Sequence, residues 1–301
     1  MNKNILCSTH FLSIIICSIT FFFTCAEAQS KNLFPCNHLQ QKYFLLSEIR
    51  SSFIKRKIFL QADCKNDKLF FKLDQSHVLI LDKFKDGSVS VEGIISYSHR
   101  PIVCPLQNDQ GAFKIKIADR TLFLEPSEKS GLVSTADVFL VPVKSLRGKV
   151  YLEKNIPVSG QFGRQRKGER FHTAIDIPTP YEESILSPAD GQVVMISNLK
   201  TQSTLFIRHL KKDKTIFYSA YSHVKDLAVS VGDLVNSQTM LARTFTREEF
   251  KKTHHVYNHV HFEVRKGLDD LGNGSIHANL HEKLSKIFVN PSLPLEGLWE
   301  W

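Results

Sequence analysis

The sequence predicts a mainly β protein in which a smaller β-rich amino-terminal domain precedes a second β domain. Short strand-like runs recur along the first half, for example at residues 69–73 and 78–81, and Asp-, Gly- and Asn-bearing turns separate them. Nine of the 13 histidines fall between His172 and His281. The second half therefore differs in character from the first half, which carries no chemical motif.

The composition is that of a globular protein. Of the 301 residues, 42% are hydrophobic and 23% are charged, and this length allows two domains of ordinary size. The net charge of +9 fits an acidic partner such as nucleic acid, an anionic membrane or a wall polymer, although scattered surface lysines are the commoner cause. No basic run is interleaved with aromatic residues, so we expect no nucleic-acid partner.

Residues 1–28 have the pattern of a secretion signal. Lys3 gives a basic start, the segment Phe11 to Cys25 is nearly all apolar, and Ala26 to Ala28 has the small-x-small cleavage pattern. The apolar run is shorter than the roughly 20 residues of a membrane-spanning helix. We therefore expect cleavage after Ala28, no stable membrane span afterwards, and an exported protein that is periplasmic, bound to the cell envelope or secreted.

The cysteines divide between the signal and the mature chain. Lipid attachment at Cys25 is an alternative to cleavage after Ala28, but the residues before Cys25 fit a lipoprotein signal poorly. After cleavage the mature chain keeps Cys36, Cys64 and Cys104. Disulfides persist in exported proteins, so one bridge and one free thiol is the simplest expectation for these three cysteines. None of them lies in the second half, so a metal site there must use nitrogen and oxygen ligands.

The amino-terminal domain is expected to span residues 29–148. The apolar spacing between Gln40 and Lys57 is closer to helical, so a helix is expected before the strands. A polar, glycine-containing stretch from Lys144 to Gly148 follows a strand-like run and indicates the boundary. The second domain then spans residues 149–301.

A histidine and an aspartate lie four residues apart at His172 and Asp176. Either a helix or an extended strand would put both side chains on one side, and Pro178 and Pro180 favour loop and strand. A surface histidine beside an aspartate is the commoner meaning of such a pair. The pair alone is a weak indication of a metal site.

The segment 259–264 alternates between polar and apolar residues, which predicts a strand. Its polar face carries His259, His261 and Glu263, so two imidazoles point the same way; a solvent-facing polar stripe is the alternative. Together the two segments supply the nitrogen and oxygen ligands that suit Zn²⁺, of which a catalytic site typically has three beside a water. The two segments hold three histidines and one aspartate, one more than the three ligands that the metal needs. The extra histidine suits proton transfer.

Six short motifs follow one another between Pro157 and Phe262. They are Gln161-Phe162-Gly163, His172-x-x-x-Asp176, Ser187-Pro188-Ala189-Asp190-Gly191-Gln192-Val193, Tyr221-Ser222-His223, Val229-Ser230-Val231-Gly232-Asp233-Leu234-Val235 and His259-Val260-His261-Phe262. In their order and spacing they resemble the lysostaphin-type (M23, LytM-like) family of zinc metallopeptidases.

The resemblance implies a two-sheet, mainly antiparallel β peptidase domain of the duplicated-hybrid-motif kind, with a groove floored by strands. It implies one Zn²⁺ ion held by His172, Asp176 and His261, with His223 and His259 as the catalytic histidines. It further implies an endopeptidase that hydrolyses peptide bonds in bacterial peptidoglycan, in stem-peptide cross-links or in bridges.

The remaining polar residues near these motifs have other expected roles. The family has no glutamate general base, so Glu263 is expected to support the site or to lie on the surface. His254 and His255 could compete as ligands, but their Lys- and Thr-bearing surroundings favour a solvated loop. His209, on a strand-like run, is expected to be structural or to lie at the cleft wall.

The glycine-rich run that the family usually shows before its paired histidines is absent. Residues 243–258 form a charged stretch without glycine. We expect this stretch to form a wall of the groove or a lid over it, with its four basic residues facing the carboxylates of the substrate. An inert surface loop is the alternative. The four are Arg243, Arg247, Lys251 and Lys252.

Two other function classes compete with an active peptidase. The first is a non-catalytic relative that binds the wall or activates another hydrolase. Such relatives usually lose ligands, whereas all five expected residues are present here. The second is a β-rich adhesion module with incidental histidines, which would hold no metal tightly.

Overall fold

The computed structural model describes residues 41–50, 53–65, 68–73, 76–83, 89–92, 107–109, 112–117, 120–131, 134–148, 155–166, 170–199, 201–268 and 281–295. The predicted signal segment, Cys36 and Cys104 lie outside these residues. Within them, no helix has both the length and the apolar character that a membrane crossing requires.

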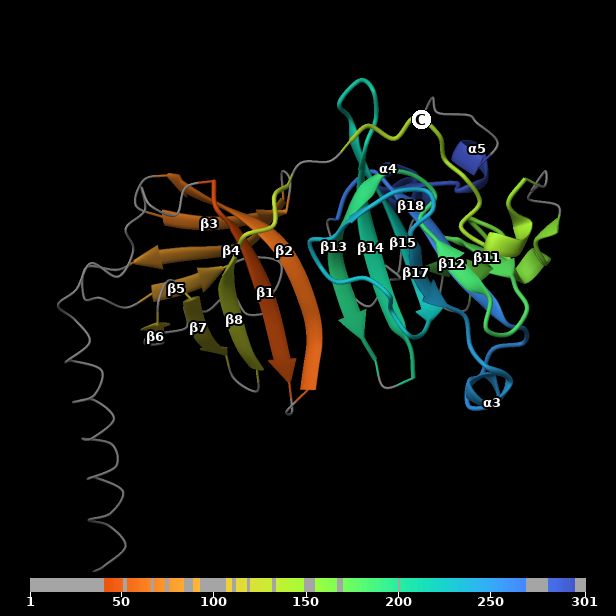
Figure 1. Cartoon of the computed structure of the whole chain (residues 1–301), viewed down its shortest axis with the longest axis horizontal. Helices are drawn as coiled ribbons and strands as arrows, with labels where there is room; N and C mark the ends of the chain where they lie inside the picture. Colours follow the sequence, from red (N-terminus) through yellow and green to blue (C-terminus); the bar gives the residue numbers. More distant parts are fainter. Residues whose placement is uncertain are drawn as a thin grey trace, which may run out of the picture.

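The amino-terminal half is an antiparallel β structure, as predicted. Its strands pair in the order β5-β4-β3-β2-β1-β8-β7-β6 (Figure 1). They are β1 (Tyr43–Arg50), β2 (Phe53–Lys65), β3 (Lys68–Leu73), β4 (Ser76–Lys83), β5 (Val89–Glu92), β6 (Gln107–Asp109), β7 (Ala112–Ile117) and β8 (Arg120–Ser127).

The helix predicted between Gln40 and Lys57 is wrong, because this segment forms β1 and the first part of β2. Strand β1 pairs along its whole length with both β2 and β8. Phe44 and Leu46, two residues apart, are both fully buried, which is the period of a strand. The local spacing of apolar residues leaves helix and strand open, and the pairing of β1 with two neighbouring strands decides for the strand.

Strand β2 also carries Cys64, which is disulfide-bonded. Cys64 is the one cysteine among the described residues, so its partner lies outside them.

Besides the short pair β9–β10, the described residues of the second half form two β sheets that face each other. The larger sheet has the antiparallel order β11-β18-β15-β14-β13, and the pair β12–β17 forms the smaller one. The fold is thus the mainly antiparallel, two-sheet arrangement that was expected. Its elements are η2 (Lys144–Leu146), η4 (Val158–Gly160), β9 (Gln165–Arg166), β10 (Arg170–Phe171), β11 (Ile175–Pro178), β12 (Ser184–Leu186), β13 (Gly191–Asn198), β14 (Ser203–Leu210), β15 (Ile216–Val224), β16 (Leu234–Val235), β17 (Met240–Arg243), α3 (Arg247–Phe250), β18 (His259–Arg265), α4 (His281–Ile287), β19 (Phe288–Val289) and α5 (Ser292–Leu295).

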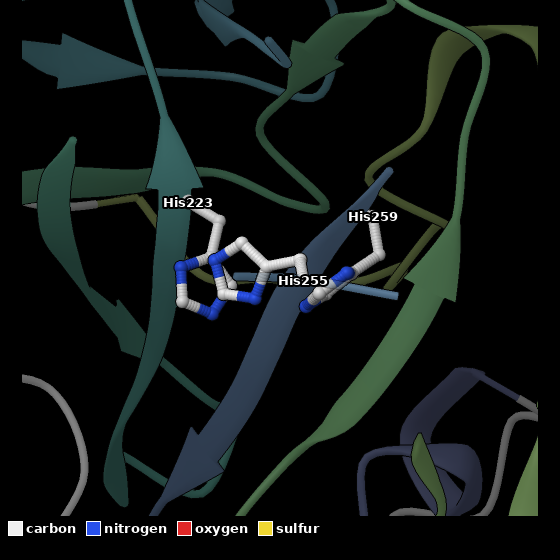
Figure 2. Close-up of side chains that lie close together, drawn as sticks. All are labelled: His223, His255 and His259. Carbon is white, nitrogen blue, oxygen red and sulfur yellow. The ribbon is translucent and has the colours of Figure 1, made fainter. Parts of the chain in front are cut away.

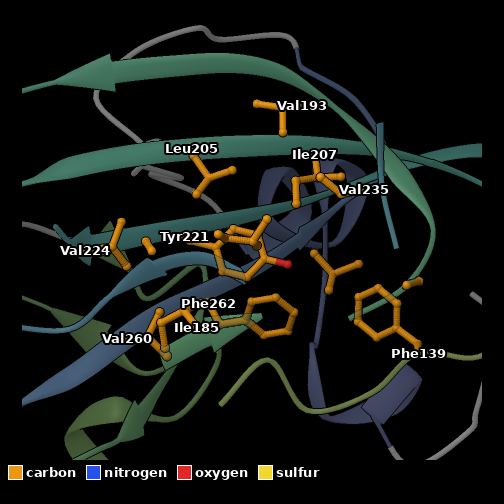
Figure 3. Packing of buried hydrophobic residues seen from close by; sticks show 14 of the residues in the cluster. Phe139, Ile185, Val193, Leu205, Ile207, Tyr221, Val224, Val235, Val260 and Phe262 are labelled. Atoms are coloured by element: carbon orange, nitrogen blue, oxygen red, sulfur yellow. The ribbon is translucent and has the colours of Figure 1, made fainter. Parts of the chain in front are cut away.

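A hydrophobic core fills the space between these two sheets (Figure 3). Strand β18 contributes Val260, Phe262 and Val264, all fully buried, and Ile185 of β12 faces them from the smaller sheet. Each such side chain contributes about 1.5–3 kcal/mol when it leaves water. A slip of one residue would move all three to the opposite, polar face of the strand, so this core fixes which face of β18 carries its histidines.

The two halves of the protein share one sheet and part of a core. Strand β13 pairs antiparallel with β2, with Met195 opposite Ile58 (Figure 1). A second hydrophobic cluster joins residues of both halves, including Phe44 from β1 and Phe206 from β14. Backbone pairing and apolar packing therefore both cross from one half to the other.

The segment 134–147 packs against the second half although it precedes the predicted boundary at residue 148. Phe139 and Val143 belong to the core between the two sheets, and Val143 bridges to Ile185. The Arg147 guanidinium donates hydrogen bonds to the backbone oxygens of Ser187 and Ser237. The boundary itself stays a prediction.

His209 lies fully buried in β14 and has a structural position. Its Nδ1–H donates to the backbone oxygen of Asp190 at 2.7 Å, and its Nε2 accepts from the hydroxyl of Ser219 at 2.7 Å. Its ring stacks on Phe217 with centroids 4.9 Å apart. Burial lowers the pKa of His209 to about 4, so the folded protein holds this ring neutral.

We predict that His209 lowers the free energy of unfolding of the protein in mild acid. The unfolded chain takes up a proton on this ring below its ordinary pKa of 6.5, whereas the folded chain does so only near 4, so stability falls as the pH falls through this window. Between pH 7 and pH 5 the loss from this group is on the order of 2 kcal/mol. Urea unfolding at both pH values should show that loss in the wild type and a smaller one in His209→Gln; equal losses would remove His209 as the cause.

Candidate metal centre

Asp176 and His261 meet because their strands place them directly opposite each other. Strand β11 pairs antiparallel with β18, and Asp176 is the partner of His261 in that register. Side chains opposite each other on one face of such a pair lie within contact distance. The Asp176 Oδ1 and His261 Nδ1 atoms are 3.0 Å apart.

His172 reaches the same point from the segment before β11. Gly163 adopts a φ of 72°, and its N–H donates to the backbone oxygen of His172 at 2.8 Å. The His172 Nδ1–H donates to the backbone oxygen of Gln161 at 3.0 Å, which directs Nε2 toward the pair. This Nε2 lies 3.2 Å from Asp176 Oδ1 and 3.3 Å from His261 Nδ1. The Gln161-Phe162-Gly163 motif thus positions His172.

The three facing atoms have the chemistry and spacing that a zinc ion requires. Two imidazole nitrogens and one carboxylate oxygen are typical zinc ligands, and all three residues are buried. Bonds of about 2.0–2.1 Å place ligand atoms about 3.3–3.4 Å apart in a tetrahedron. The three observed separations, 3.0, 3.2 and 3.3 Å, are close to that value. These residues fit a zinc ion.

Glu263 supports His261 from behind and is not a surface residue. The His261 Nε2–H donates to Glu263 Oε1 at 3.1 Å, and the Thr173 hydroxyl donates to the same oxygen at 2.6 Å. Arg265 donates to Glu263 Oε2 through Nε at 2.7 Å and contacts it through Nη2 at 2.6 Å. These contacts fix the orientation of the His261 ring with Nδ1 facing Asp176.

The charges of this group depend on one another. Burial alone would raise the pKa of Asp176, but hydrogen bonds from His172 and His261 hold it well below its usual range. Burial alone would lower the pKa of His261, but Asp176 and Glu263 outweigh it and raise the pKa to about 9. Zinc binds the unprotonated nitrogen of an imidazole, so a metal ion at this group would compete with a proton for His261 Nδ1.

His223 and His259 lie beside this group. His223 lies at the shift in pairing between β14 and β15 and has a φ of 64°, a strained value for a residue with a side chain. Its ring centroid lies 4.9 Å from that of His259 and 5.6 Å from that of His261. Burial lowers the pKa of His223 well below its ordinary value and that of His259 to about 4. Both rings are therefore neutral near pH 7.

The structure brings a further histidine to this place. The sequence favours a solvated loop for His254 and His255; His254 is exposed, but this expectation is wrong for His255, which is half-buried. The His255 ring centroid lies 4.2 Å from that of His223 and 5.0 Å from that of His259 (Figure 2). Its spacing of four residues before His259 is the one sequence signal that could have indicated this.

One pocket of about 400 Å³ contains both groups of histidines. Arg166 and Arg170 also line it, and Arg166 Nη2 lies 3.5 Å from Asp176 Oδ2. Residues 254–257, the end of the glycine-free stretch, form another part of the wall, as expected.

Contrary to expectation, the four basic residues of that stretch do not face the pocket. None of the four is among the described residues that line it. Arg243 makes ion pairs with Asp226 and Glu249 at 2.6 Å, and Lys251 pairs with Glu248 at 2.7 Å. The short helix α3 carries Glu249 and Glu248, the acidic partners of Arg243 and Lys251.

Several solved structures resemble parts of the chain. A solution structure of lysostaphin is 15% identical, with a TM-score of 0.33; the match covers 46% of this chain and 49% of the lysostaphin chain. LytU is 23% identical, with a TM-score of 0.29, and the match covers 40% of this chain and 74% of that one. A zinc-containing peptidase from Vibrio cholerae is 14% identical, with a TM-score of 0.28, and the match covers 69% and 52%.

No curated protein matches the chain. The model of Peptidase family M23 matches residues 170–275. This interval contains His172, Asp176, His223 and both histidines of the paired motif, and it coincides with most of the two-sheet half. Residues 170–275 are therefore similar to the domain of Peptidase family M23.

Proposed function

We propose that the protein is an exported zinc endopeptidase that hydrolyses peptide bonds in bacterial peptidoglycan. His172, Asp176 and His261 hold one zinc ion, and His223 and His259 are the catalytic histidines. The observation that carries the proposal is the convergence of three ligand atoms at tetrahedral spacing, beside two neutral imidazoles, in one pocket of an M23 domain.

The chemistry follows from the orientation of the two catalytic imidazoles. A bound zinc ion supplies an activated water and polarises the carbonyl of the peptide bond. In both rings the Nδ1–H group donates a hydrogen bond to a carbonyl oxygen. His223 donates to the side-chain oxygen of Gln202 at 2.7 Å, and His259 donates to the backbone oxygen of Tyr257 at 2.8 Å. Each Nε2 therefore presents a lone pair, and one of the two rings would accept the proton that the attacking water loses and donate it to the leaving amine.

Charge around the pocket supports an anionic peptide substrate. Arg166 and Arg170 line the pocket, and the protein carries a net charge of +9. The stem peptides of peptidoglycan carry carboxylates, which such side chains attract. The secretion pattern of residues 1–28 and the disulfide at Cys64 support export, because disulfides persist outside the reducing cytosol.

A wall-binding or activating role without hydrolysis is less well supported. Such a role needs neither an intact ligand set nor acid–base groups beside it. Here all five residues lie in one pocket, and three of them are held by hydrogen bonds that orient their nitrogens.

Loss of a ligand should empty the proposed zinc site. Asp176→Ala and His261→Ala each leave two of three protein ligands, which is too few to hold a catalytic zinc tightly. Elemental analysis of the dialysed variants should show well below one zinc per chain. His254→Ala, which alters an exposed histidine nearby, is the control and should keep its zinc. Normal zinc content in either ligand variant would contradict the assignment.

Loss of a catalytic histidine should separate binding from chemistry. His223→Ala removes no proposed ligand, so we expect it to keep one zinc. It should lower kcat by on the order of 10²–10⁴, the usual contribution of an acid–base group. Zinc analysis and hydrolysis rates on wall fragments measure the two effects. A variant with full activity would remove His223 from the mechanism.

The proposed substrate can be tested directly. Purified sacculi incubated with the zinc-loaded protein should release muropeptides whose masses show cleavage of a peptide bond, and the masses identify whether a cross-link or a bridge was cut. His223→Ala is the matched control for contaminating hydrolases. Sacculi that stay intact with the wild type, under conditions where zinc is bound, would exclude the proposed substrate.

A further inference from the structure

We propose that His223, His255 and His259 form a second zinc site, which fills only when zinc exceeds one equivalent and then blocks hydrolysis. The inference rests on the proposed function, since it takes the two catalytic histidines as ligands. One potential ligand nitrogen from each of the three residues lies within 4.8 Å of the other two. Figure 2 shows the three rings converging from β15, β18 and the loop before β18.

Hydrogen bonds prepare two of the three rings for a metal. The Nδ1–H groups of His223 and His259 are held by oxygens of Gln202 and Tyr257, at 2.7 and 2.8 Å. Each ring therefore keeps an unprotonated Nε2, the form in which histidine binds zinc. Partners of this kind on the far ring nitrogen are typical of metal-binding histidines.

His255 is held in place by an ordered loop. Helix α3 begins with a complete capping box, in which Thr246 and Glu249 bond each other's backbone N–H groups at 3.1 and 2.8 Å. The His255 N–H then donates to the Thr253 hydroxyl at 3.2 Å, and its ring stacks against Phe245 with centroids 6.3 Å apart. Among the described residues, the ring itself makes no hydrogen bond that a metal would have to replace.

The second site should bind zinc more weakly than the first. The first group has ligand separations of 3.0–3.3 Å, close to those of a zinc tetrahedron, and it includes a carboxylate. The second group is spread over up to 4.8 Å and has three neutral imidazoles. His259 Nε2 is only 3.7 Å from Asp176 Oδ1, so a second cation would also lie beside the first. Both differences favour occupation of the first site.

Occupation of the second site removes the proton-transfer groups. An Nε2 lone pair that is bound to zinc cannot accept a proton from water. Zinc at His223, His255 and His259 therefore stops the reaction without displacing the first ion. This makes the enzyme sensitive to the free zinc concentration, and His255 is the residue on which that sensitivity depends.

Zinc titration of the full-length, metal-stripped protein by calorimetry tests the second site. The wild type should bind two equivalents, one tight and one weaker. His255→Ala should keep the tight equivalent, which also shows that it is folded, and its weaker affinity should fall at least about 10-fold, since loss of even a hydrogen-bond partner of a ligand costs that much. His254→Ala is the control and should bind as the wild type does. One equivalent in the wild type, or two unchanged equivalents in His255→Ala, would overturn the proposal.

Two further measurements distinguish this proposal from the proposed function. Asp176→Ala should lose the tight equivalent and keep the weaker one; if its tight binding is unchanged, the first site is wrong and the second is judged by His255→Ala alone.

On wall fragments, the zinc concentration that halves the wild-type rate should rise at least about 10-fold in His255→Ala. The same inhibition in both proteins would show that zinc acts elsewhere.

Discussion

The antiparallel register between β11 and β18 is the constraint on which the metal centre depends. It places Asp176 directly opposite His261, so that a carboxylate and an imidazole from distant parts of the chain face each other. The register is fixed from the other side of the sheet, where Val260 and Phe262 are fully buried. A shift by one residue would turn the histidines into the apolar core and move the apolar residues to the face of the metal centre, so core packing and ligand geometry are selected together.

The same strand carries the charge needed to hold that geometry. His261, Glu263 and Arg265 lie on one face of β18 and form a continuous line of buried polar contacts. A buried carboxylate without partners would be costly, but Glu263 accepts from three neighbours and Arg265 lies between two phenylalanine rings at 4.8 and 5.0 Å. The ligand His261 is thus oriented by a network that reaches the protein core.

The sequence predicted those parts of the fold and site that depend on local pattern. Alternation over residues 259–264 predicted a strand, because one face of it packs on the core. The helix expected at residues 40–57 failed because pairing with β2 and β8 outweighs local periodicity. The placement of His255 depends on the cap of α3 and the loop after it, so its four-residue spacing before His259 was not enough to predict it. The burial of Glu263 likewise depends on hydrogen bonds from Arg265, on the same strand, and from Thr173, which precedes β11 and is distant in the sequence.

The pairing of β2 with β13 has a consequence for how the protein responds to proteolysis. A protease that cut the chain between the halves would leave them joined by backbone hydrogen bonds and by the cluster that contains Phe44 and Phe206. Separation of the fragments would uncover β13 as an edge strand with apolar Met195 on it, and such edges recruit other strands. Nicking therefore yields a two-fragment complex, whereas removal of the first half yields a fragment prone to aggregate.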